Sequence, residues 1–202
     1  MKTTIVLLFL ALLSCNKDSV KQDPIAQLPT ETQTGANTFG CIINNQVFYP
    51  RDGSGNLGGG TADKGLINWG DPSGNQNFNE IDCGNFKDGK PASRMIIHLQ
   101  GLAANGVGEY VLKTTNFLKS IDGLQQNYIF VNVFDATSNS YKYYGSYENS
   151  GKVIITRYDA VNFIFSGSFS GKLRLKNGIE EINITQGRFD INKTTLTQTS
   201  FP

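Results

Sequence analysis

The sequence VNFIFSGSFSGKLRL, residues 161–175, decides the fold. Its odd positions are apolar side chains or glycines, and its even positions, apart from Ile164, are polar. This alternation predicts a β-strand with one face toward a core and the other toward water, as in antiparallel sheet. A strand of this length would extend about 50 Å, longer than is usual in globular proteins. We therefore expect bends at Gly167 and Gly171, and one strand that serves two sheets.

The next segment, residues 176–191, predicts a hairpin with a bulge. Asn177-Gly178 is the strongest turn signal in the chain and predicts a two-residue type I′ loop. The apolar positions change parity after Ile184, so one extra residue must be absorbed, and Gly187 is the natural site because glycine takes positive φ without steric cost. The predicted cross-strand pairs are Leu173 with Ile182, Gly171 with Ile184, Gly167 with Phe189, and Phe165 with Ile191.

Strand periodicity recurs along the rest of the chain. The segments are residues 38–43, 46–49, 66–69, 78–86, 94–102, 108–113, 127–135, 141–147 and 152–158. A short helix is expected only within residues 114–126. We predict an all-β protein: an antiparallel β-sandwich of about nine to ten strands, with a partly open barrel as the alternative. The single β-domain spans residues 37–192 and is followed by a frayed tail, 193–202.

Composition limits the classes of partner. The chain has 202 residues, and its 18 Lys and Arg nearly balance its 17 Asp and Glu. A net charge of +1 creates no strong field that would attract nucleic acid or an anionic membrane surface. The 22 glycines and the 11% of aromatic residues are typical of a turn-rich β protein with a real core.

The N-terminus predicts export and lipid attachment. Lys2 precedes an apolar run at residues 5–13, which is too short to span a bilayer but suits a signal peptide. The sequence LLSC at residues 12–15 resembles the bacterial lipobox, which implies removal of residues 1–14 and acylation of Cys15. Several acyl chains would anchor the protein stably in the lipid bilayer. Residues 15–36 are polar, contain two prolines and predict a flexible tether.

Two segments of the β-domain resemble a known family. TQTGANTFGCIINNQVFYP at residues 32–50 and ITQGRFDI at residues 184–191 are similar to the opening and the end of a family of Bacteroidota lipoproteins of unknown function. The resemblance implies an all-β outer-membrane lipoprotein and brings no activity, substrate or catalytic residue. Whether the domain faces the periplasm or the cell surface is left open.

Cys41 and Cys83 each share a strand face with apolar neighbours. Outside the reducing cytoplasm such a pair predicts a disulfide bond. Two buried free thiols are the alternative.

Three tyrosines are the candidate binding residues. Tyr141, Tyr143 and Tyr147 have the spacing of one strand face, and rows of exposed aromatic side chains bind sugars or protein partners. The alternative is that they form the half-buried face of an ordinary sheet.

Catalytic and metal signals are weak. His98 is the only histidine, and no serine or cysteine stands in a nucleophile motif that would use it. The loop at residues 51–65 places Asp52 and Asp63 at the spacing of calcium ligands, but Leu57 occupies the position where such a loop needs glycine. We expect no cofactor and no metal, and calcium binding by this loop is left open.

The function predicted from these observations is binding without chemistry. The chain is expected to be a membrane-anchored lipoprotein of the bacterial cell envelope whose β-domain binds a glycan or a protein. The alternative is a structural or assembly component of the envelope. A hydrolase is the third reading, and it would require an Asp/Glu pair that only folding brings together.

Overall fold

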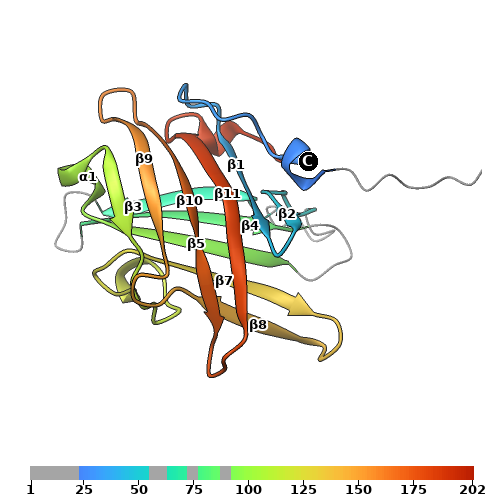
Figure 1. The fold of residues 1–202 in the computed structure, drawn as a ribbon. Helices are drawn as coiled ribbons and strands as arrows, with labels where there is room; N and C mark the ends of the chain where they lie inside the picture. Colours follow the sequence, from blue (N-terminus) through green and yellow to red (C-terminus); the bar gives the residue numbers. More distant parts are fainter. Residues whose placement is uncertain (1–22, 55–62, 72–76, 87–91) are drawn as a thin grey trace, which may run out of the picture.

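A computed structural model describes residues 23–54, 63–71, 77–86 and 92–202 of the chain (Figure 1). This part of the chain forms eleven antiparallel strands. They are β1 Thr38–Ile43, β2 Gln46–Phe48, β3 Leu66–Asp71, β4 Phe78–Asn85, β5 Ser93–Gln100, β6 Gly108–Val111, β7 Tyr128–Asp135, β8 Ser140–Gly145, β9 Gly151–Asp159, β10 Ile164–Leu175 and β11 Glu181–Asn192. None of its helices is long and apolar enough to cross a bilayer.

The strands form a single, strongly curled sheet. Nine of them follow the order β2-β1-β11-β10-β8-β7-β5-β4-β3, while β9 pairs with β10 and β6 pairs with β9. In Figure 1, strands β1, β9, β10 and β11 cross steeply over β4, β5 and β7, and the core lies between these two layers. The all-β prediction is confirmed, and the sheet is a half-barrel, close to the partly open barrel that was the alternative.

Strand β10 pairs with two neighbours on the same side of one sheet, and does not serve two separate sheets as predicted. It pairs with β9 through residues 164–171 and with β8 through Arg174 and Leu175. The β9 ladder shifts register beside Gly167, where an added Cβ would lie only 2.3 Å from the Ile154 carbonyl oxygen. The bare glycine therefore permits the close approach with which β10 bends from one layer into the other.

The β10–β11 hairpin has the predicted register. All four predicted pairs are present, and the ladder shifts between Phe169 and Gly171. The residue with positive φ in the bulge is Gln186 (φ 54°) and not Gly187. The loop is also longer than predicted, because the Gly178 N–H donates to the Leu175 carbonyl (3.0 Å) and the Leu175 N–H to the Glu180 carbonyl (2.8 Å).

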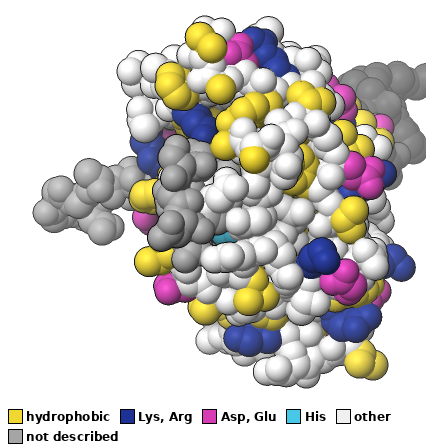
Figure 2. Space-filling view, turned by 90° about the vertical axis from the view of Figure 1, so that its left-hand side faces the viewer, with side chains coloured by type: hydrophobic (Ala, Val, Ile, Leu, Met, Phe, Trp, Pro, Cys, Tyr) yellow, Lys and Arg dark blue, Asp and Glu magenta, His cyan; other side chains and the backbone are white. Residues whose placement is uncertain are grey.

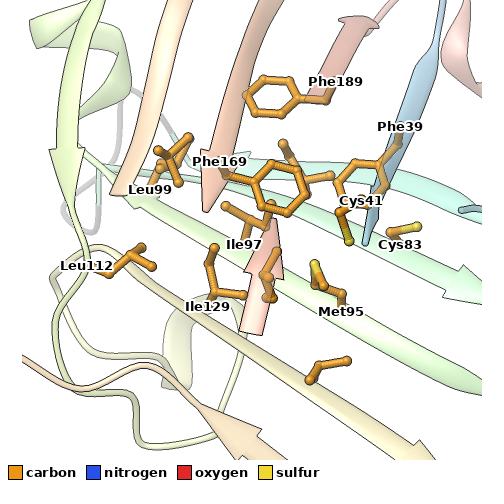
Figure 3. Close-up of a cluster of buried hydrophobic side chains, with 14 of the residues drawn as sticks. Phe39, Cys41, Cys83, Met95, Ile97, Leu99, Leu112, Ile129, Phe169 and Phe189 are labelled. Atoms are coloured by element: carbon orange, nitrogen blue, oxygen red, sulfur yellow. The ribbon is translucent and has the colours of Figure 1, made fainter. Parts of the chain in front are cut away.

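The main core joins both layers. Figure 3 shows Phe39 and Cys41 from β1 and Phe169 from β10 facing Met95 and Ile97 from β5. Cys41 and Cys83 are fully buried in this core. They are free thiols, which was the alternative, and do not form the predicted disulfide. They pack as small apolar side chains, and burial raises the pKa of both thiols.

Residues 23–37, here called the strap, are bound to the sheet, whereas the sequence predicted a flexible tether as far as residue 36. From residue 23 onward the chain is fixed to the sheet, because the buried Asp190 carboxylate on β11 binds it. The donors to this carboxylate are the Thr32 hydroxyl (2.6 Å), the N–H groups of Thr34 (2.9 Å), Gly35 (2.8 Å) and Ala36 (3.1 Å), and the Ser166 hydroxyl (2.7 Å). A polar segment is thus ordered by one buried charge.

The C-terminal tail is ordered as well, contrary to the prediction of fraying. Leu196 is buried in the core within a short 3₁₀ helix, Leu196–Gln198. The Asn37 side chain donates to the hydroxyls of Thr195 (2.9 Å) and Thr199 (2.8 Å). One asparagine therefore links the strap to the tail.

Candidate binding cavity

A cavity of about 470 Å³ opens where edge strand β3 approaches the turn between β9 and β10. The helix α1 (Leu102–Asn105) borders it. Figure 2 faces this side of the molecule, and hydrophobic side chains gather in its upper half, around the β9–β10 turn. The lining residues used below are Asn68, Trp69, Tyr158, Asp159, Phe163 and Lys193.

Trp69 lines the cavity from edge strand β3. Leu66 points into the core, whereas Trp69 lies opposite Glu80 of β4 and therefore on the outer face of the sheet. With β3 at the edge, 53% of the tryptophan surface is exposed. The preceding residue, Asn68, donates to the side chain of Asn79 (2.9 Å) and the carbonyl of Glu80 (2.8 Å), which fixes the backbone beside the indole.

Phe163 is held in the cavity wall by an unusual backbone. Its φ is +55°, a left-handed conformation that a bulky residue rarely adopts. The Lys193 N–H donates to the Phe163 carbonyl (3.0 Å) and fixes this turn to the end of β11. The predicted strand therefore begins at Ile164, and Val161 and Phe163 are 84% and 56% exposed rather than in the core.

Asp159 shapes the same turn. Its carboxylate accepts from the N–H groups of Val161 (3.1 Å) and Asn162 (2.9 Å), from the Asn162 side chain (2.8 Å) and from the Arg157 guanidinium (2.8 Å). The side-chain and backbone hydrogen bonds from Asn162, with that from Arg157, hold the pKa of Asp159 well below its usual range. This acid is therefore already paired.

The arrangement suits a ligand with both apolar and polar faces. Trp69, Phe163 and the half-buried Tyr158 supply flat apolar surfaces, while Asn68 and Lys193 supply polar groups. Pockets of about 300–1,000 Å³ with aromatic walls and few polar groups are typical of small-ligand sites.

Two of the three predicted tyrosines lie on strand β8, and the third follows it. Tyr141 and Tyr143 share the outer face of β8, and they are 40% and 41% exposed. Tyr141 makes an edge contact with Phe134 (ring centroids 5.5 Å apart). Tyr147 lies in the following loop, where the Arg174 guanidinium stacks over its ring at 4.3 Å.

His98 belongs to a buried polar cluster on the outer face of β4 and β5. Its Nδ1 lies 3.1 Å from Glu80 Oε2, and its ring stacks between Phe78 (centroids 5.1 Å apart) and Tyr128 (4.5 Å). The segment at residues 112–127, here called the roof, covers the pair: the Ser120 N–H donates to Glu80 Oε2 (2.9 Å). The roof contains a 3₁₀ turn, Ser120–Asp122, and not the predicted helix.

Asp82 lies two residues along β4, on the same face. Its carboxylate is 2.7 Å from the Arg94 guanidinium and 3.2 Å from the Lys119 ammonium of the roof. Burial raises the pKa of Asp82 while Arg94 and Lys119 lower it, and the result is a raised pKa. Every charged group of this cluster has a partner within the protein, which is typical of structural charges.

The calcium alternative gains no support from its described residues. Asp52 accepts from the N–H groups of Gly65 (2.6 Å) and Phe201 (3.1 Å) and is 3.7 Å from the Lys64 ammonium. Residues 55–62 of the loop, with Leu57, lie outside the described part of the chain. Within the described ranges, no three His, Cys, Asp or Glu side chains are placed to hold a metal ion.

Comparison of the chain with protein-family models, curated proteins and solved structures gives no match. The cavity therefore has to be interpreted from its own geometry. Sequence reasoning missed Trp69, Phe163 and Lys193. The signals were a lone tryptophan on a short strand and a polar Asp-Ala-Val-Asn turn, residues 159–162, that interrupts the apolar pattern.

Proposed function

We propose that this protein is a lipid-anchored component of the bacterial cell envelope whose β-domain binds a glycan without chemistry. The observation that carries the proposal is the cavity of about 470 Å³, whose lining includes the exposed aromatic residues Trp69 and Phe163. Large exposed aromatic side chains that line one cavity mark a binding site, because isolated domains rarely leave such surface in water without a use.

The anchor is supported by the LLSC sequence at residues 12–15 and by the position of the strap. The strap begins with the 3₁₀ helix Pro24–Gln27, on the opposite side of the molecule from α1 (Figure 1). A chain acylated at Cys15 would thus hold the domain with its cavity turned away from the anchoring bilayer. Intact mass spectrometry of the native protein tests this: removal of residues 1–14 with added acyl mass is expected, and an unlipidated product would contradict it.

The binding proposal is tested with the mature protein by affinity electrophoresis in gels that contain envelope and plant polysaccharides. Retardation is expected, and Trp69→Ala should abolish it because the stacking surface is lost. Ile179→Ala, at a side chain that is 95% exposed in the β10–β11 loop, is the control and should migrate as the parent does. Retardation that survives Trp69→Ala but disappears in Tyr141→Ala/Tyr143→Ala would move the site to β8.

A second candidate function, a component of an envelope assembly, is favoured by the roof. Its apolar side chains Leu118, Ile121 and Leu124 are 50%, 65% and 39% exposed. Cross-linking in intact cells followed by purification tests this function. A protein partner that is lost when Leu118 and Ile121 are both changed to Ser would support an assembly role.

A further inference from the structure

The cavity is lined by an ammonium group that has no acidic partner among the described side chains. Lys193 follows β11 directly, and its ammonium lies over the ring of Phe165, 5.4 Å from the ring centroid. Among the side chains that the structure describes, a set that leaves out Asp71, no carboxylate forms an ion pair with it. This lysine therefore differs from Lys119 and Lys142, which both pair with acids.

The surroundings of Lys193 do not compensate for its charge. Asp159, the carboxylate that lines the same cavity, is already bonded to Arg157 and Asn162. Within the described part of the cavity wall, the charge of Lys193 is thus unmatched among aromatic rings. Burial in these surroundings lowers the pKa of Lys193, because an apolar environment disfavours the ammonium form.

We infer that the glycan bound in this cavity is acidic, and that the Lys193 ammonium pairs with a sugar carboxylate while Trp69 and Phe163 stack on the sugar rings. This inference rests on the proposed glycan binding and specifies its ligand class as a saccharide that contains uronic acid. An anion in the cavity would supply the partner that the ammonium lacks, and a charge-assisted bond there is stronger than at an open surface.

The test compares each acidic polysaccharide with its own carboxyl-reduced form. Pectin, alginate and hyaluronan are used as probes, and reduction converts each carboxylate to a hydroxymethyl group while the rest of the chain is kept. The parent protein should bind at least one native polysaccharide about tenfold or more tightly than its reduced form, and added salt should weaken this preference.

Lys193→Met removes the charge and keeps an unbranched apolar stem of similar length. We expect this variant to bind the native and the reduced polysaccharide equally, at the level of the reduced form. Lys172→Met is the matched control, because it makes the same change of net charge on the exposed face of β10 and should keep the preference. Thermal unfolding of both variants confirms that each is folded.

The outcomes separate the two proposals. Equal binding of native and reduced polysaccharides by the parent overturns the acidic ligand and leaves glycan binding standing. Loss of the preference in Lys172→Met as well as in Lys193→Met would show a general charge effect and would also overturn the role of Lys193. Binding of no polysaccharide, or binding that Trp69→Ala does not weaken, overturns the glycan proposal and this inference with it.

Discussion

Two regions of the molecule remove charged groups from water, and they do so differently. On the outer face of β4 and β5, Glu80 and Asp82 are fully buried, and His98, Arg94 and the roof supply their partners. At the cavity, Lys193 lies among aromatic rings and forms no ion pair with any side chain that the structure describes. A charge with partners inside the protein holds the fold together, whereas a charge without them is available to a ligand. Mutation should therefore affect stability in the first region and binding in the second.

The largest loss of stability is expected for Glu80→Ala. The variant leaves the Ser120 N–H and the His98 ring without their shared acceptor beneath the roof, and removing one member of a buried pair typically costs about 3–5 kcal/mol. Denaturant unfolding measures this loss. Glu109→Ala is the control: Glu109 pairs with Lys152 at 2.7 Å, but both side chains are about half exposed, so a change of about 0–1 kcal/mol is expected. Equal losses of unfolding free energy in Glu80→Ala and Glu109→Ala would contradict the special role given to the buried cluster.

Asp190→Asn comes next, since the strap depends on that carboxylate. We expect a loss on the order of 2 kcal/mol at neutral pH, because an amide cannot accept all the hydrogen bonds that the carboxylate accepts. Although burial acts to raise it, the bonds from Thr32 and Ser166, with backbone N–H groups, lower the pKa of Asp190.

The lowered pKa fixes the sign of the pH dependence. A carboxylate with a lower pKa in the folded than in the unfolded state stabilises above its unfolded pKa, and this stability disappears as the pH falls through the folded pKa. The difference in unfolding free energy between the parent and Asp190→Asn should therefore be largest near pH 7 and decrease in acid. Unfolding titrations across this range measure it, with the exposed Asp122→Asn as control. A gap that stays constant with pH would contradict the assignment.

Lys193→Met should leave stability nearly unchanged, or raise it slightly, because it removes a charge that burial disfavours and breaks no ion pair. Thermal unfolding checks this expectation. A loss comparable to that of Glu80→Ala would mean that Lys193 has a structural partner, and the contrast between the two regions would disappear.

The smallest effect concerns an exposed network. Backbone and side-chain hydrogen bonds from Thr137, Lys142 and Ser138 lower the pKa of Asp135 to about 2. Lys142→Met should raise that pKa only partly, because the Thr137 N–H still donates to the carboxylate. Titration of the Asp135 carboxyl by NMR measures the shift. A return to the ordinary aspartate value would show that the ion pair dominates over the backbone bond.

The sequence predicted the sheet better than the two segments that flank it, the strap and the C-terminal tail. Alternation in β10 and β11 specifies which side chains share a face, so the register and the bulge follow from residues such as Gly167 and Phe189. The order of the strap and the tail does not follow from periodicity, because it depends on contacts of Asp190 and Asn37 with residues more than 150 positions away. Polar segments look flexible in a sequence when their partners are distant.

The cavity was less predictable than the fold. It joins Trp69 of an edge strand, Phe163 of a turn and Lys193 at the end of β11, which no spacing rule connects. The carboxylates Glu80 and Asp82 alternate on one strand face, but their burial depends on a roof that begins some 30 residues later. The tyrosine row was predicted from strand spacing, and β8 ends at Gly145, before Tyr147.

The attachment of the strap also decides how the domain would carry a mechanical load. A pull on the N-terminus would reach the strap first and pass through the Asp190 carboxylate to β11. This strand lies between β1 and β10 inside the sheet, so the force would enter the middle of a hydrogen-bonded ladder and not an edge strand that could peel away. Under tension the strap should detach from β11 before the sheet is disturbed. The chain between the anchor and the sheet would then be longer, while the cavity stays intact.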